Sequence, residues 1–91
     1  MTYVIQPRTY EQAKRLGVTV KVSSNPKKKI DVFKDGVKIA SIGAIGYKDY
    51  TIYLKEDKKL AEEKRKAYKA RHEKDRKIIG SAGYYADQLL W

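Results

Sequence analysis

Residues 30–42 read IDVFKDGVKIASI, in which two alternating runs of apolar and polar residues flank Asp35-Gly36. An Asp-Gly pair between such runs is the strongest short-range signal for a β-hairpin, because a type I′ turn needs positive φ at both central residues. Upstream, Val18, Val20 and Val22 alternate with polar residues and predict a further strand with one buried face. The sequence therefore predicts a three-stranded antiparallel meander.

The segment before the meander, residues 1–17, predicts a short helix. Thr9 stands three residues before Gln12, which is the spacing of a capping box. We expect two helical turns from Tyr10 to Leu16, with Gly17 as their C-terminal stop.

A tyrosine-rich segment follows the hairpin and completes the stretch 18–54. Tyr47, Tyr50 and Tyr53 recur at a spacing of three and are interleaved with Lys48 and Lys55. The segment predicts an edge strand or an extended aromatic stretch. Aromatic and basic residues together can stack bases and hold phosphates, but the chain has only one Phe and one Met. We therefore expect these rings to belong to the core.

Residues 55–91 combine a basic helix with an apolar tail. Eleven of the 21 Lys and Arg residues, but only six Asp and Glu residues, lie between Lys55 and Lys77. Asp57 is a candidate N-cap, the pattern predicts one long helix from Lys58 to about Ile79, and Gly80 would end it. The helix presents an anion-binding surface or, alternatively, an ordinary solvated face. The candidate anion-binding residues are Lys64, Arg65, Lys66, Lys69, Arg71, Lys74, Arg76 and Lys77, extended by Lys27, Lys28 and Lys29 beside the hairpin.

The tail predicts a last short helix from Tyr84 to Trp91. Its candidate protein-docking residues are Tyr84, Tyr85, Leu89, Leu90 and Trp91. Three large apolar side chains left in water would each forgo about 1.5–3 kcal/mol of burial free energy. We expect the tail to pack on the protein's own core, with a pocket on a neighbouring protein as the alternative.

The chain length predicts one small domain over residues 1–91, and the expected sheet and helices make it an α+β domain. A formal net charge of +10 attracts nucleic acid, anionic lipid or acidic protein surfaces. The start of the chain lacks a basic region followed by an apolar run, and no apolar run approaches the length of a membrane span. We therefore expect neither a signal peptide nor a membrane-spanning segment.

Candidate catalytic and metal-binding residues are few. The chain has no Cys, and its one His, His72, lies among charged residues and is better interpreted as a packed helical side chain than as a base. Gly43 and Gly46 bracket an irregular link that matches no phosphate-binding motif. We expect no enzyme activity, no catalytic residue, no metal, no cofactor and no small-molecule substrate.

Three stretches resemble a small family of basic proteins encoded by large nucleocytoplasmic DNA viruses. They are IGAIGYKDYT (residues 42–51), YKARH (residues 68–72) and GSAGYYADQLLW (residues 80–91). The likeness spans roughly residues 29 to 91 and brings no catalytic residues with it. It implies a viral setting, with a particle protein favoured over an enzyme.

Together these observations predict a non-enzymatic structural protein of a large DNA virus particle, as a minor capsid component. Its partners would be other capsid or virion proteins, with nucleic acid or an anionic membrane surface as further candidates. It would occur in the virion, and in the host cytoplasm or nucleus during assembly. The alternative is a nucleic-acid-binding protein that acts on the viral genome or its transcripts.

Overall fold

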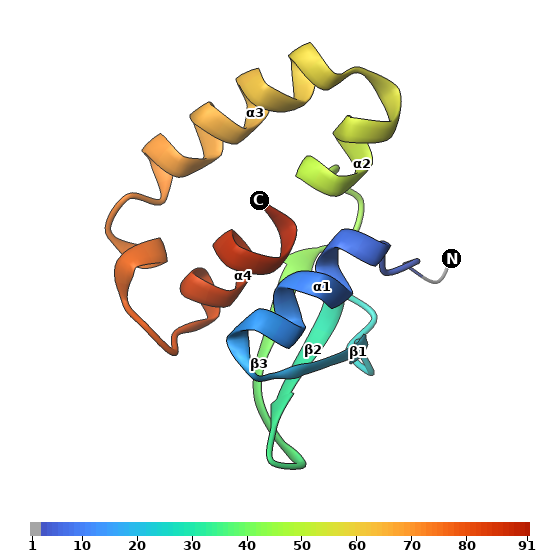
Figure 1. Ribbon diagram of the computed structural model, residues 1–91, viewed down its shortest axis with the longest axis vertical. Coiled ribbons are helices and arrows are strands. Elements are labelled where there is room, and N and C mark those ends of the chain that lie inside the picture. The colour runs from blue at the N-terminus through green and yellow to red at the C-terminus, as the bar shows by residue number, and fades with distance from the viewer. Residues whose placement is uncertain (1–2) are drawn as a thin grey trace.

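The computed structural model describes residues 3–91 and has an α+β fold built on a three-stranded antiparallel sheet (Figure 1). The strands, in the order β1-β2-β3, are β1 (Thr19–Val22), β2 (Lys28–Lys34) and β3 (Val37–Ala44). The helices are α1 (Pro7–Leu16), α2 (Tyr50–Glu56), α3 (Lys58–Arg71) and α4 (Ala82–Leu90), with a 3₁₀ turn η1 (Asp75–Lys77) between the last two. Figure 1 shows α1 and α4 over one face of the sheet, while α2 and α3 form an arm at the end of the sheet opposite the hairpin tip.

The hairpin turn has the predicted geometry. Asp35 has φ of 51° and Gly36 has φ of 80°, so both central residues are in the left-handed region that a type I′ turn requires. Lys34 pairs directly with Val37, which leaves a two-residue loop. The prediction of a hairpin at Asp35-Gly36 is confirmed, with one irregularity in register in β2 between Val32 and Phe33, just before the turn.

The core lies between one face of the sheet and the two helices that cover it. Ile30 and Val32 of β2 are completely buried, and so is Leu89 of α4. The core cluster also holds Val20, Ile42, Ala13 and Leu90. The C-terminal tail therefore packs on the protein's own core, as expected, and not in a pocket on a neighbouring protein.

The helix α1 begins earlier than the sequence predicts, and Thr9 is not its cap. Pro7 occupies its first turn, where the fixed φ of proline suits a helix start. Thr9 is therefore inside the helix and fully buried, and its hydroxyl donates a 3.0 Å hydrogen bond to the carbonyl oxygen of Leu89. Gly17, with φ of 72°, ends α1 as expected.

Tyr50 and Tyr53 of the tyrosine-rich segment lie in the helix α2, and Tyr47 lies in the loop before it, so the prediction of a strand or extended stretch is wrong. Asp49 caps α2, because its carboxylate accepts a hydrogen bond from the backbone N–H of Ile52. The same carboxylate is held by Lys29 of β2 and by the hydroxyl of Tyr3. The cap itself is a local contact, and the distant contacts with Lys29 and Tyr3 fix the orientation of its carboxylate.

The basic helix is also shorter than predicted. Asp57 caps α3 as expected, but the helix ends at Arg71 and not near Ile79. The chain then turns through η1, against which the start of α4 packs so closely that a Cβ on Gly83 would lie 2.9 Å from the Cβ of Asp75. A helix continued to residue 79 would carry the tail away from the sheet, so packing of α4 favours the early end.

A polar network occupies the opposite face of the sheet, where Asp31 is almost fully buried. Its carboxylate accepts hydrogen bonds from Ser23 at 2.6 Å and Ser41 at 2.7 Å, and one from the backbone N–H of Ser24. Burial would raise the pKa of Asp31, but these hydrogen bonds and the charge of Lys38 outweigh it and lower the pKa to about 2. The network ties the start of the β1–β2 turn to β2 and β3.

Candidate anion-binding cleft

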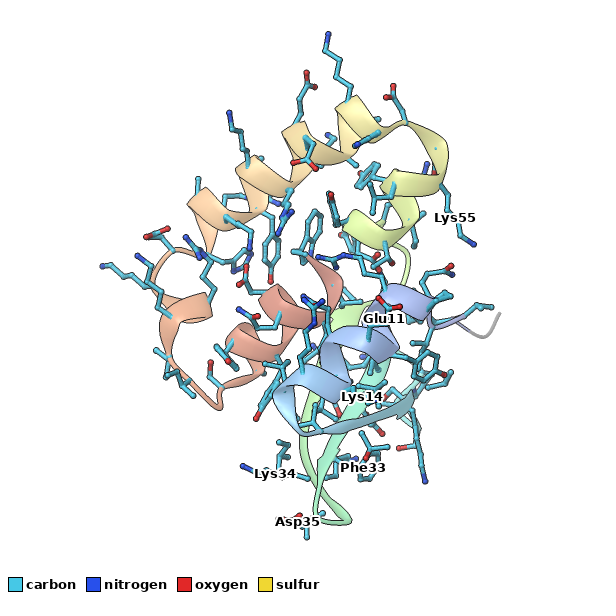
Figure 2. All side chains as sticks on the ribbon, in the orientation of Figure 1. Glu11, Lys14, Phe33, Lys34, Asp35 and Lys55 are labelled. Carbon is cyan, nitrogen blue, oxygen red and sulfur yellow. The ribbon has the colours of Figure 1, made fainter. Side chains whose placement is uncertain are left out.

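A cleft of about 580 Å³ separates the arm from the rest of the molecule. It is bounded by α3, by the C-terminal end of α4 and by the loop that joins β3 to α2. Its lining combines cationic and aromatic side chains: Lys48, Lys64, Arg71, His72, Tyr47, Tyr53, Tyr68 and Trp91. Aromatic side chains are visible between α3 and α4 in Figure 2.

The helix α3 presents two cations and an aromatic ring toward this cleft. Lys64, Tyr68 and Arg71 recur at the three- and four-residue spacing that places side chains on one side of a helix, and all three line the cleft. The other side of α3 carries Lys59, Glu62, Glu63 and Lys66, which are exposed and line no part of the cleft. Both nitrogen and oxygen tips project from that outward side in Figure 2. The charges of these four outward residues balance, whereas the cleft side of α3 presents two cations, Lys64 and Arg71, and no carboxylate.

Two cations of the cleft have no acidic partner among residues 3–91. Lys64 and Arg71 are exposed, and neither lies within 4 Å of a carboxylate in that part of the chain. Lys48 is different, because its amine is 2.7 Å from the carboxylate of Glu56, and this hydrogen bond raises its pKa. Lys64 and Arg71 are thus the charges best placed to meet an anion in the cleft.

A stack of three rings forms one wall. The ring of Tyr68 lies 4.4 Å from that of Trp91 at an interplanar angle of 5°, and 4.4 Å from that of His72 at 28°. Tyr68 is therefore the middle ring, and burial followed by the nearby charge of Asp87 raises its pKa. Beside the stack, Lys69 of α3 forms a 2.7 Å ion pair with the buried Asp87 of α4. The rings and this ion pair fasten α3 to the end of α4.

Lys29 was predicted to bind anions, but it has a structural role. Its side chain is only 4% exposed and lies 2.9 Å from the carboxylate of Asp49, which is 2% exposed. Its amine also donates to the backbone oxygen of Tyr47. A buried cation that is paired in this way is unavailable to a ligand. Lys29 instead holds the loop that carries Tyr47 and Lys48 at the edge of the cleft.

Other predicted anion-binding residues are engaged within the protein. Arg65 lies 4.8 Å from the centre of the Tyr50 ring, which Arg8 also approaches at 5.0 Å. Burial, and then the like charge of Arg65, lower the pKa of Arg8. Arg76 donates to the carboxylate of Glu73 and to the backbone oxygen of Lys69, and Lys77 also pairs with Glu73. These side chains stabilise the arm and its end.

The remaining predicted site residues are divided between the surface and the core. Lys27, Lys66 and Lys74 are exposed and Lys28 is partly buried, but none of the four lines the cleft. In the tail, Tyr85, Leu89 and Leu90 are buried in the protein's own core, as expected, and are not available to another protein. Tyr84 and Trp91 are partly exposed, and Trp91 belongs to the cleft.

The sequence prediction missed the joint role of Tyr68, His72 and Trp91. The four-residue spacing of Tyr68 and His72 was a signal that their rings share one side of a helix. No local pattern indicated that Trp91 would stack on Tyr68, because that contact needs the chain to turn back after α3. The cleft therefore depends on the tertiary structure of the arm.

Within residues 3–91 the structure has no group of three His, Cys, Asp or Glu side chains arranged to hold a metal ion. In the same part of the chain, every helix is too short or too polar to cross a membrane. Comparison with protein-family models, curated proteins and solved structures finds no match. A function for this chain is therefore inferred from the side chains of the cleft.

Proposed function

We propose that this chain is a non-enzymatic structural protein of a large DNA virus particle, a minor capsid component that holds an anionic partner in the cleft between α3 and α4. One observation carries the binding part of the proposal: Lys64 and Arg71 face the cleft without a carboxylate partner among the described residues. The particle setting rests on the resemblance of residues 29–91 to proteins of large nucleocytoplasmic DNA viruses.

The geometry favours the cleft over the open surface as the place of binding. A concave site lined by one sign of charge concentrates the electric field and raises the local concentration of oppositely charged groups. Two unit charges 4 Å apart attract by about 1 kcal/mol in bulk water and by about 4 kcal/mol where the effective dielectric constant falls to that of a protein surface. On the outward side of α3, Glu62 and Glu63 would repel the same anion.

A second candidate function is that of a nucleic-acid-binding protein that acts on the genome or its transcripts. The specific observation in its favour is that aromatic rings line the same cleft as the free cations. Acidic protein surfaces and lipid headgroups need the cations alone, whereas nucleic acid uses both.

Fractionation of purified particles separates the two functions. A capsid component remains in the shell at a fixed copy number after the genome is removed by nuclease and salt. A protein that acts only on genome or transcripts leaves with the nucleic acid, or is absent from particles. Loss of the chain from shells, combined with recovery on intracellular viral DNA or RNA, would contradict the capsid proposal and favour the second function.

A further inference from the structure

The eight tyrosines of the chain differ in exposure: some rings pack inside the protein, whereas others are exposed to solvent. Tyr50 and Tyr68 are 6% and 9% exposed and serve the packing of the arm. Tyr47 is 75% exposed at the edge of the cleft, so its ring contributes little to the core. Tyr53 is partly buried in the cleft wall, with the amine of Lys48 at 5.8 Å from its ring centre. An aromatic ring that is left in solvent beside cations suggests a ligand with a flat face.

The cleft has the size and composition of a site for one small planar anion. Sites for small molecules usually measure about 300–1,000 Å³ and combine apolar rings with a few placed polar groups; this cleft measures about 580 Å³. Its one acidic side chain in the lining, Asp49, is already engaged by Lys29 and Thr51. The cleft therefore offers rings and positive charge, and no unpaired acidic side chain among the described residues that line it.

We propose that the cleft holds a nucleotide unit of single-stranded nucleic acid. The base packs on the rings of Tyr47, Tyr53 and Trp91, and the flanking phosphates meet Lys64 and Arg71. This combination of stacking rings and a basic groove is how proteins bind single strands without reading their sequence. In a duplex the base faces are stacked within the helix, so they cannot use these rings. The inference rests on the proposed function, because it names the anionic partner that the cleft would hold.

Trp91 makes the inference directly measurable, because it is the only tryptophan in the chain and lies in the cleft wall. The intact protein is titrated at low salt with a short oligothymidylate and, separately, with linear polyphosphate of equal charge, while tryptophan fluorescence and binding are recorded. We expect the oligothymidylate to bind more tightly and to quench Trp91. Polyphosphate should bind more weakly and leave the fluorescence unchanged.

A matched pair of tyrosine variants tests the ring contribution without disturbing the core. Tyr47→Ser removes an exposed ring at the cleft, and Tyr10→Ser removes a ring that is 52% exposed on α1 and lines no part of the cleft. Loss of one stacked base costs about 1–3 kcal/mol, so Tyr47→Ser should weaken oligothymidylate binding by roughly 5-fold to 150-fold. Polyphosphate binding should be unchanged in both variants, and Tyr10→Ser should behave as the wild type.

Three results would overturn the inference. If polyphosphate binds as tightly as oligothymidylate and Tyr47→Ser changes neither, the cleft is an anion site that takes no base, while the proposed function survives. If phosphatidylserine vesicles bind and the oligothymidylate does not, the partner is a membrane surface. If none of the three probes binds at low salt, both the inference and the anion-binding part of the proposed function fail.

Discussion

The sheet with its two covering helices and the arm of α2 and α3 are held by different kinds of contact. The sheet side packs fully buried aliphatic chains such as Ile30, Val32 and Leu89. In the arm, the only completely buried aliphatic side chain among the described residues is the small one of Ala61. The arm contacts α4 through the ring of Tyr68, stacked on Trp91, and through the ion pair of Lys69 with Asp87. Dispersed apolar burial stabilises the first region, whereas rings and charges position the second.

This difference explains how a chain that is 35% charged can both fold and bind. Burial of aliphatic side chains contributes most of the stability of a small domain. Regions with few buried apolar contacts open more easily, and binding elements are drawn from them. We therefore expect substitutions in the sheet region to change stability, and substitutions of the cations of the cleft to change binding alone.

The largest effect should come from the core side of this comparison. Leu89→Ala leaves a cavity where a completely buried side chain packs, so it should lower the free energy of unfolding by about 2–5 kcal/mol. Urea denaturation followed by circular dichroism measures the change. Ile79→Ala is the control, since Ile79 is 83% exposed just before the same helix. Equal stability of the two variants would show that α4 is not part of the core.

A polar site on the sheet should give the next largest effect. Asp31→Asn loses charge-assisted hydrogen bonds from Ser23 and Ser41 and should cost about 1–3 kcal/mol at neutral pH. The pKa of Asp31 falls from an ordinary 3.8 to about 2 in the folded protein, so its contribution is complete above pH 3.8. The contribution is lost as the pH falls from there toward about 2. The stability difference between wild type and variant should therefore shrink over that interval, and a constant difference would exclude the proposed ionised network.

The hairpin turn should respond somewhat less. Gly36→Val places a β-branched residue at φ of 80°, which costs about 1–2 kcal/mol even though open space surrounds the position. Gly36→Asn is the control, because asparagine tolerates the left-handed region. Melting temperatures compare the two. If the Gly36→Val variant has the same melting temperature as the wild type, the type I′ turn does not set the register of the hairpin.

The smallest effect on stability should appear in the arm. The double variants Lys64→Gln with Arg71→Gln, and Lys59→Gln with Lys66→Gln, each remove two exposed cations from opposite sides of α3. Glutamine keeps the helix propensity of the residues it replaces. We expect both double variants to unfold within about 0.5 kcal/mol of the wild type. A clear destabilisation by the first pair alone would give Lys64 and Arg71 a structural role.

The parts of the fold that were predictable from sequence depend on neighbouring residues. Asp35-Gly36 dictates its turn, and the side chain of Asp57 caps α3, through contacts within a few residues. The helix at Tyr50 also begins with a local cap, Asp49 on the N–H of Ile52, but the spacing of the tyrosines was interpreted as a strand. The early end of α3, in contrast, follows from the return of α4 to the sheet.

The candidate site was predictable only in its charge. The sequence indicates an excess of Lys and Arg in residues 55–77, and the helical period places Lys64 and Arg71 on one side. It does not reveal that Lys29 is buried against Asp49, or that Trp91 stacks on Tyr68. Those pairings join segments that meet only after the chain folds, so no local pattern encodes them.

The central claim is that the cleft side of α3, and not its outward side, meets the anionic partner. The salt dependence of oligothymidylate binding, measured for the two double variants and the wild type, tests it most directly. Each phosphate contact on a single strand contributes about −0.7 to the slope of log K against log salt concentration. Lys64→Gln with Arg71→Gln should therefore make the slope shallower by about 1.4, whereas Lys59→Gln with Lys66→Gln should leave the slope unchanged. Equal changes of slope in the two double variants would contradict the claim.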